Sequence, residues 1–332
     1  MLNPPVYQDV INAARRIKGH AIKTPLLTSH ILDEICGAQV YLKAENLQRT
    51  GSFKFRGAMN SVTTYLEQEA DLAKRGVIAC SSGNHAQGIA EAARLLNVPA
   101  TIIMPFDAPK IKVERTRRSG ATVLFYDRAK EDRDVVTNAK AEELDAILIH
   151  PYNNPYVMAG QGTCALEAVG FFDENDIELN RVFACTGGGG LSAGIALVMQ
   201  EHFPKARFHT VEPKGFDDYS RSLREGERLT NATTVGSICD AIITPMPGEL
   251  SFSILKGYAS QGLVISDEEA LRAVAFAFNE LKVVVEPGGA AALAALLSNK
   301  IDIQGETVLL TLSGGNIDPE MMRQALSLGS PS

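Results

Sequence analysis

The amino-acid sequence predicts an α/β protein in which parallel β-sheets are covered by helices on both faces. Short, nearly continuous apolar runs alternate with helical patterns along most of the chain, which is typical of buried parallel strands connected by helices. The chain has 332 residues, enough for about two domains at roughly 150 residues each. Its 45% hydrophobic and 21% charged residues are ordinary for a globular protein, so a disordered, collagen-like or coiled-coil chain is excluded.

Several classes of partner are disfavoured by charge and composition. The net charge of -7 argues against nucleic-acid binding, which normally needs a basic surface that neutralises phosphates. No apolar run approaches the roughly 18 residues of a membrane span, and residues 1–5 lack the pattern of a signal peptide. The five cysteines are widely spaced without a CxxC motif, which disfavours a disulfide framework or a zinc site. We expect buried, reduced thiols in a cytoplasmic protein.

The elements of the first half alternate regularly. Apolar, β-branched runs predict the strands, and the longer stretches between them have helical periodicity. The expected strands are Gly76–Cys80, Ala100–Met104, Thr122–Phe125 and Ile147–Ile149. The expected helices are Ala86–Leu96, Lys110–Arg118 and Glu131–Leu144.

The second half continues the alternation after a gap. Strands are expected at Val182–Cys185, Phe208–Glu212 and Val308–Leu312, and helices at Leu191–Gln200, Asp267–Leu281 and Gly289–Ser298. The segment Lys214–Pro247 is more polar, carries several glycines and has no clear element pattern, and it is expected to include loops. Because ligands of open parallel sheets bind beyond the carboxyl ends of the strands, the loops after these strands are where chemistry is expected.

Four successive glycines, Gly187–Gly190, lie between a predicted strand and a predicted helix. Glycines leave the backbone N–H groups unshielded, and a helix N-terminus adds its positive dipole end, so the run predicts a phosphate-binding loop. The stretch Gly188–Ala193 also fits GxGxxA, and Glu212 stands where a ribose-binding acid belongs. A nicotinamide-dependent oxidoreductase is therefore one interpretation.

Lys54 lies between Phe53 and Phe55 in the stretch Gly51–Gly57. An apolar setting lowers the pKa of a lysine and makes its amine nucleophilic, so that it can form a Schiff base with an aldehyde cofactor. Taken alone, this residue is better interpreted as a surface lysine on an amphipathic edge. Only its combination with the other motifs favours a role for Lys54 in binding a cofactor.

The assembled motifs carry a family resemblance. The motifs are Lys43–Gln48, Gly51–Gly57, Ser81–His85, Gly187–Gly190 and Ser313–Asn316, in that order. The sequence resembles the fold-type II enzymes that use pyridoxal 5'-phosphate, the tryptophan synthase β-like group, and within it the threonine/serine dehydratases and serine racemases.

The resemblance implies a domain organisation. Two domains of three layers, each with a parallel sheet, are expected: a large cofactor-binding domain formed by residues 1–65 plus 149–332, and a small inserted domain at 66–148. It also implies a homodimer.

The resemblance further implies a role for each motif residue. Lys54 would bind the cofactor covalently, Phe53 would pack on its ring, and Asn84 would bond its phenolic oxygen. Gly187–Gly190 would hold its phosphate, Ser313 would face its pyridine nitrogen, and the loop at Glu286 would close the site. The substrate carboxylate would bind at Ser81, Ser82, Asn84 and His85.

The implied reaction is β-elimination from L-threonine or L-serine, giving a 2-keto acid and ammonia. The amine of Lys54 would serve as general base, and a hydroxyl at Ser313 instead of a carboxylate favours elimination over transamination. Ser82 stands where racemase-like members have serine, and its hydroxyl would deliver a proton from the opposite face. It is equally interpreted as a hydroxyl that bonds backbone.

A cation site is a second implication of the resemblance. Glu212, Asp218 and the backbone carbonyl of Phe216 match ligands of Mg²⁺ or Ca²⁺ in racemase-like members, and all-oxygen ligation suits these hard cations. This interpretation competes with Glu212 as a ribose ligand. The alternative is a solvated acidic loop.

Arg133 is the residue that bears on substrate choice. It matches an arginine near the distal end of the substrate in racemase-like members, where a guanidinium would receive a second carboxylate and point to 3-hydroxyaspartate. It also reads as a solvated helix start. Ala241 stands where many relatives have glycine, and its methyl group would narrow the space beside the cofactor ring.

Two other classes of protein remain to be weighed. A nicotinamide oxidoreductase leaves Lys54, Ser81–Asn84 and Ser313–Asn316 without a role. A catalytically silent amino-acid-binding protein is expected to have lost Lys54, which is present.

Overall fold

The computed structural model describes residues 3–69, 71–108 and 110–329 and confirms the predicted α/β class. The larger sheet has six strands in the order β1-β2-β10-β7-β8-β9, parallel except that β1 runs antiparallel to β2. Its strands are β1 (Leu26–Leu27), β2 (Gln39–Ala44), β7 (Arg181–Cys185), β8 (Arg207–Pro213), β9 (Ala259–Ile265) and β10 (Thr307–Leu312).

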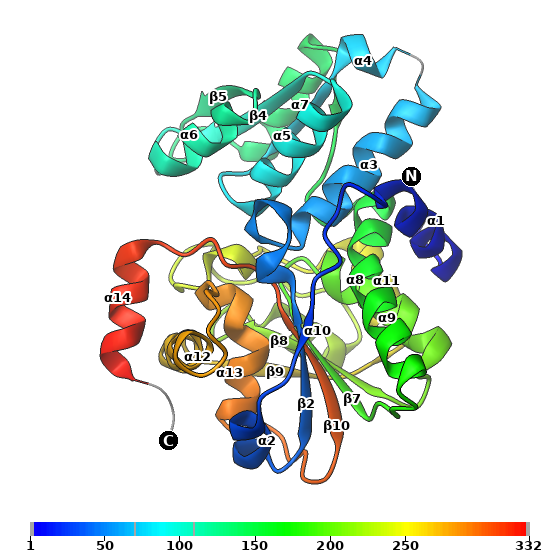
Figure 1. The fold of residues 1–332 in the computed structure, drawn as a ribbon. Helices are drawn as coiled ribbons and strands as arrows, with labels where there is room; N and C mark the ends of the chain where they lie inside the picture. Colours follow the sequence, from blue (N-terminus) through cyan, green and yellow to red (C-terminus); the bar gives the residue numbers. More distant parts are fainter. Residues whose placement is uncertain (1–2, 70, 109, 330–332) are drawn as a thin grey trace.

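The smaller sheet is parallel throughout, with four strands in the order β5-β4-β3-β6. These are β3 (Val77–Cys80), β4 (Ala100–Pro105), β5 (Thr122–Tyr126) and β6 (Ile147–Leu148). Figure 1 shows this sheet and its helices above the larger sheet. All four strands lie within residues 66–148, although the exact domain boundaries stay a prediction, as does the homodimer.

The described helices connect and cover the strands. In the first half they are α1 (Tyr7–Ile17), α2 (His30–Cys36), α3 (Lys54–Gln68), α4 (Leu72–Arg75), α5 (Asn84–Leu96), α6 (Lys110–Arg118) and α7 (Arg133–Glu143). In the second half they are α8 (Pro155–Glu174), α9 (Gly190–His202), α10 (Asp218–Glu225), α11 (Glu249–Leu255), α12 (Asp267–Asn279), α13 (Ala291–Leu297) and α14 (Pro319–Leu328). Within the described ranges, no helix is long and apolar enough to cross a membrane.

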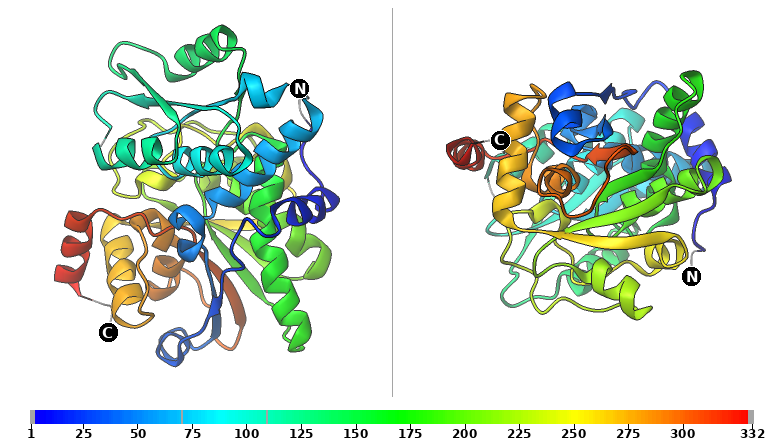
Figure 2. Two further views of the ribbon diagram at one scale, coloured as in Figure 1. Left: turned by 45° about the horizontal axis from the view of Figure 1, so that its top comes forward. Right: turned by 90° about the horizontal axis from the view of Figure 1, so that it is seen from below.

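Helices cover both faces of the larger sheet, as its continuous apolar strands predict. Along β7, Val182 and Ala184 join a core with residues of α8 and α9, whereas Phe183 and Cys185 join a core with α12 and α13. Successive residues of a strand point to opposite faces, so one short strand contributes to two cores. The view from below in Figure 2 shows these helices on the two sides of the sheet.

The polar segment Lys214–Pro247, which the sequence left unassigned apart from loops, contains helix α10 and the 3₁₀ turn η3 (Asp240–Ile242) as well as loops. A buried carboxylate, Glu212, accepts hydrogen bonds from the first backbone N–H groups of α10, which gives this short helix a tertiary anchor. The helix predicted from Gly289 begins as the 3₁₀ turn η4 (Pro287–Ala290) and continues as α13.

Three helices near the centre of the molecule touch through their backbones. A Cβ atom on Gly160 of α8 would lie 2.6 Å from the carbonyl oxygen of Arg56 and from the Cα of Gly57 in α3. A Cβ atom on Gly162 of α8 would lie 2.5 Å from the carbonyl oxygen of Gly194 in α9. Helix α8 therefore holds α3 on one side and α9 on the other at distances that only glycine permits.

Candidate active site

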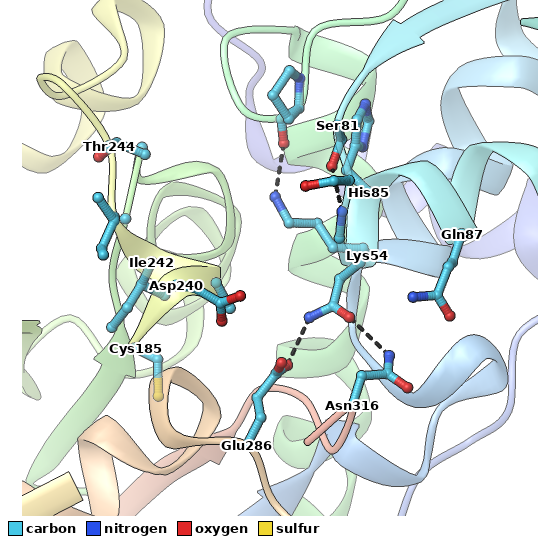
Figure 3. Close-up of a pocket in the computed structure, with 18 of the residues that line it drawn as sticks. Lys54, Ser81, His85, Gln87, Cys185, Asp240, Ile242, Thr244, Glu286 and Asn316 are labelled. Carbon is cyan, nitrogen blue, oxygen red and sulfur yellow. Dashed lines mark hydrogen bonds between the residues drawn. The ribbon is translucent and has the colours of Figure 1, made fainter. Parts of the chain in front are cut away.

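A cavity of about 550 Å³ is lined by residues from the segments around the larger sheet and from those around the smaller sheet. Its walls include the residues that follow the carboxyl ends of β3 and β7, which is where ligands of parallel sheets bind. Lys54, at the start of α3, and the glycine loop Gly187–Gly190, at the start of α9, line this same cavity. Figure 3 shows Lys54 among the side chains that surround it.

Lys54 is buried in the cavity wall. Its Nζ donates a hydrogen bond of 3.1 Å to the carbonyl oxygen of Pro151 and lies 5.2 Å from the centre of the Phe53 ring. Burial lowers the pKa of Lys54 to about 8, and the nearby carboxyl group of Glu286 opposes this shift. Near neutral pH the amine is therefore neutral, and so nucleophilic, far more often than that of an ordinary lysine with a pKa of about 10.4.

The glycine loop has close neighbours behind it. A Cβ atom on Gly188 would overlap the ring of Tyr152, and one on Gly189, whose φ is +87°, would overlap the hydroxyl of Tyr219. The carbonyl oxygen of Gly188 accepts a 2.7 Å hydrogen bond from Ser251. Within the described chain, no hydrogen bond uses the N–H groups of Gly187–Gly190. These donors are available to an anion at the N-terminus of α9.

Asn84 belongs to a side-chain network on the opposite wall. Its Nδ2 donates to Glu286 Oε1 at 2.6 Å, and its Oδ1 accepts from Asn316 Nδ2 at 2.7 Å (Figure 3). Burial raises the pKa of Glu286 to about 7, against the hydrogen bond from Asn84. The network fixes which end of the Asn84 amide is the donor. The sequence indicates Asn316 only through its place in the motif Ser313–Asn316 and gives it no separate role.

Ser313 lies behind the cavity wall and does not line the cavity itself. It is buried, and it lies close to the thiol of Cys185, which does line the cavity. Its backbone carbonyl accepts from the N–H of Phe53 at 3.1 Å. A contact between Ser313 and a pyridine nitrogen stays a prediction.

The segment Ser81–His85 forms one side of the cavity at the start of α5. Ser81 Oγ accepts from the N–H of Gly83 at 3.1 Å. His85 Nε2 lies 3.0 Å from the carbonyl oxygen of Ile149, and burial lowers the pKa of His85 to about 3. His85 is therefore a neutral histidine that is hydrogen-bonded to the backbone. Although it lines the cavity, its lowered pKa does not suit it to act as an acid or base near neutral pH.

The position of Arg133 agrees with a helix start and also with a place beside the substrate, the two interpretations of its sequence. It is the first residue of α7, and it also lines the cavity that holds Lys54. Its Nε lies 3.2 Å from Asp134 Oδ1, and its side chain is 41% exposed. Lys112 and Arg115 of α6 line the cavity as well, so this side of the cavity is cationic.

The predicted cation ligands lie away from the cavity. Glu212 is fully buried and accepts from the N–H groups of Tyr219 and Ser220, both at 2.7 Å. Asp218 Oδ1 accepts from Asn231 at 2.6 Å, while its buried Oδ2 has no hydrogen-bond partner among the described residues. Burial raises the pKa of both carboxyl groups, that of Asp218 to about 7, and the charge of Asp218 adds to the shift of Glu212.

These two acids fit a hard cation better than a ribose. An unpartnered buried carboxylate oxygen is costly without a compensating charge, and Glu212 does not reach the cavity. No group of three or more His, Cys, Asp or Glu side chains in the described ranges is arranged for a metal. Further ligands would therefore be backbone carbonyls, such as that of Phe216, or water, and the cation stays a prediction.

A parallel α/β fold brings a buried nucleophilic lysine to the same cavity as a set of loop N–H groups that bond no acceptor of the described chain. This combination defines an enzyme built for a phosphorylated aldehyde. Comparison with known proteins agrees with this class. The family model described as pyridoxal-phosphate dependent enzyme matches residues 17–314, and the chain belongs to that family.

Its relatives are ammonia-lyases and racemases. An L-threo-3-hydroxyaspartate ammonia-lyase from Pseudomonas sp is 45% identical over 95% of this chain and 96% of its own. An L-threonine ammonia-lyase from Thermotoga maritima is 38% identical over 97% of this chain and 78% of its own. The solved structure of maize serine racemase has a TM-score of 0.89 and 32% identity over 98% of this chain and 97% of that structure.

The family membership decides between the classes weighed from the sequence. The chain is a pyridoxal-phosphate-dependent enzyme of the ammonia-lyase and racemase group, and the nicotinamide interpretation is not supported. The residues present fit the cofactor, because Lys54 and the loop donors share one cavity large enough for it.

Proposed function

We propose that the protein eliminates water from a β-hydroxy amino acid and releases a 2-oxo acid and ammonia, with 3-hydroxyaspartate as its preferred substrate. The observation that carries the substrate class is the position of Arg133 in the wall of the cavity that holds Lys54. L-Threonine and L-serine, the first expectation from the sequence, are the comparison substrates.

The residues that would hold the cofactor are those that line the cavity around Lys54. Gly187–Gly190 would bind its phosphate, Phe53 would contact its ring, and Asn84, held by Glu286, would donate to its phenolic oxygen; Ser313 would complete the site. When bound, the cofactor supplies a conjugated ring that stabilises negative charge at the substrate Cα.

Lys54 would move the proton. Its amine, with a lowered pKa, is suited to removing the Cα proton of a bound amino acid near neutral pH. The β-hydroxyl leaves as water together with the proton taken from Cα. The enamine that is released tautomerises to an imine, and a second water molecule hydrolyses the imine to the oxo acid and ammonia. The N–H groups at the start of α5, with Ser81, Ser82 and Asn84, would hold the α-carboxylate.

Arg133 would bind the second carboxylate of 3-hydroxyaspartate. Its nearest carboxylate, Asp134, contacts Nε, which leaves the Nη groups for a bidentate pair with the substrate. Threonine has a methyl group at the corresponding position and gains nothing from this arginine. The 45% identical Pseudomonas relative is named for 3-hydroxyaspartate, which supports the same preference.

The test compares Arg133→Gln with the parent protein on L-threo-3-hydroxyaspartate and L-threonine, by oxo-acid release. Loss of a charge-assisted hydrogen bond of about 1.5–3 kcal/mol predicts a fall of about 10- to 100-fold in kcat/KM for 3-hydroxyaspartate, and a change within about threefold for threonine. Arg128→Gln is the control, because Arg128 pairs with the exposed Asp107 and is not a lining residue. Equal losses on both substrates would count against the proposal.

Racemisation is a second candidate, favoured by Ser82. Its side chain lines the cavity, and no hydrogen bond within the described ranges uses its hydroxyl. Ser82 would deliver a proton to Cα from the side opposite Lys54. Chiral analysis of L-serine incubations is expected to show D-serine that disappears in Ser82→Ala while oxo-acid release continues; absence of D-serine in the parent protein would remove this candidate.

The cation is part of the same proposal. Mg²⁺ or Ca²⁺ would bind to Glu212, Asp218 and the carbonyl of Phe216, supported by the unpartnered buried Oδ2 of Asp218. All-oxygen ligands suit both ions.

A further inference from the structure

We propose that Tyr219 is a positioning residue that couples the cation site at Glu212 and Asp218 to the glycine loop, so that cation and cofactor strengthen each other's binding. This inference rests on the proposed function, which supplies both ligands. It concerns a residue that belongs to neither site but contacts both.

The backbone of Tyr219 is tied to the acidic pair. It follows Asp218 directly in α10, and its N–H donates to Glu212 Oε1 at 2.7 Å. The next N–H, of Ser220, donates to the other oxygen of the same carboxylate at 2.7 Å. Any shift of Glu212 or Asp218 toward a cation is therefore transmitted to the backbone that carries the tyrosine.

The hydroxyl of Tyr219 is tied to the glycine loop. Its Oη lies 2.6 Å from Ser251 Oγ and 3.3 Å from the carbonyl oxygen of Gly188. Ser251 in turn donates to that carbonyl at 2.7 Å. The same hydroxyl occupies the space where Gly189 would carry a Cβ. Two consecutive residues of the loop thus rest against one side chain.

The side chain between these two ends has no room to adjust. Tyr219 is 0% exposed and belongs to the core formed with α8, α9 and α11. Close-packed interiors transmit displacements instead of absorbing them. A cation that fixes Asp218 and Glu212 would therefore fix the Tyr219 hydroxyl, and with it the carbonyl of Gly188 and the orientation of the neighbouring N–H groups.

A second route between the sites exists and must be separated from this one. Strands β7 and β8 are neighbours, and the N–H of Thr186 donates to the carbonyl of Val211 at 2.9 Å. Thr186 directly precedes the glycine loop and Val211 directly precedes Glu212, so this backbone bond also connects the two sites. Removal of the Tyr219 hydroxyl leaves this backbone route intact. Coupling that survives its removal would belong to the sheet.

The experiment measures coupling on the holoenzyme. After treatment with EDTA, the protein is titrated with MgCl₂ or CaCl₂. Cation affinity is read by calorimetry, the bound phosphate by ³¹P resonance, and cofactor affinity by its release on dilution. Because coupling is reciprocal, the cation is expected to lower the cofactor dissociation constant at least about fivefold in the parent protein and to shift its ³¹P resonance.

Tyr219→Phe removes only the hydroxyl. We expect the coupling factor of this variant to fall to about twofold or less, since one hydrogen-bonded link is lost, with the ³¹P shift lost as well. Tyr258→Phe is the matched control: Tyr258 packs on the same core and donates to the carbonyl of Ala206, away from the loop. It is expected to couple like the parent protein.

Each result decides something. Undiminished coupling in Tyr219→Phe overturns the inference in favour of the sheet route. Absence of any cation binding removes the cation site and the coupling together, while oxo-acid release by the same preparation shows that the proposed reaction stands. If Tyr219→Phe fails to fold, Ser251→Ala, which removes the other hydroxyl of the link, must show the same loss of coupling.

Discussion

At the scale of single residues, burial decides the chemistry of Lys54. The pKa of its amine is lowered to about 8 by burial, so its neutral fraction rises with pH around that value. We expect the rate at which the cofactor-free protein captures pyridoxal phosphate, followed by absorbance, to rise with pH to a plateau with a midpoint near 8. An ordinary lysine would give a midpoint near 10.4.

Glu286 provides the control for this pH dependence. Its carboxylate raises the pKa of Lys54 against the effect of burial, so Glu286→Gln is expected to move the midpoint to lower pH. Lys54→Ala is expected to show no covalent capture at any pH. A midpoint near that of free lysine would contradict the prediction, because it would mean that the amine of Lys54 is exposed to water and not buried.

Sequence reasoning located single residues unevenly. Lys54, Asn84 and the glycine loop were found because each stands in a motif, and Arg133 because it matches an arginine of racemase-like members. All of them line one cavity. Asn316 received no role, since its effect passes through Asn84 and such links are invisible without coordinates. The burial of Ser313 beside Cys185 likewise depends on packing between segments far apart in the sequence.

At the scale of elements, the glycine contacts of α8 lead to a prediction. Gly160→Ala places a methyl group against the backbone of α3, and such overpacking costs about 1–3 kcal/mol. We expect a lower thermal midpoint and faster loss of cofactor, measured by calorimetry and absorbance.

Gly170→Ala is the control in the same helix. A Cβ atom there would meet nothing within 4 Å, and alanine is favoured over glycine in a helix by about 0.5–1 kcal/mol. Its midpoint should stay equal or rise. Similar losses in both variants would show that the helix, and not its contact with α3, is responsible.

Several of the elements that sequence reasoning missed lack a regular apolar pattern. Helix α8 was not recognised, because it is buried along most of its length and shows no clear polar face. Strand β9 lies at the edge of the larger sheet and is half exposed, so it lacks the continuous apolar run of its neighbours. Helix α10 is short and polar, and its stability comes from Glu212 rather than from its own sequence.

At the scale of the whole molecule, the cavity depends on contacts between distant parts of the chain. Lys112 of α6 and Asp240 of η3 both line it and form an ion pair of 3.1 Å. The parallel sheets and the alternation of strands and helices were predictable from sequence patterns. The closeness of these two segments was not, because no local pattern encodes which loops face each other.

The glycine contacts of α8 also bear on how such a protein can diversify. Because α3 begins at Lys54 and α9 at the glycine loop, backbone contact through Gly160 and Gly162 sets the spacing between amine and phosphate sites. Side-chain changes have little room to alter that spacing without loss of the cofactor. New substrate specificities are therefore expected to arise at Arg133, Lys112 and Arg115, where substitution leaves the helix contacts unchanged. The residues that can change substrate choice and the residues that preserve cofactor binding thus lie in separate parts of the chain.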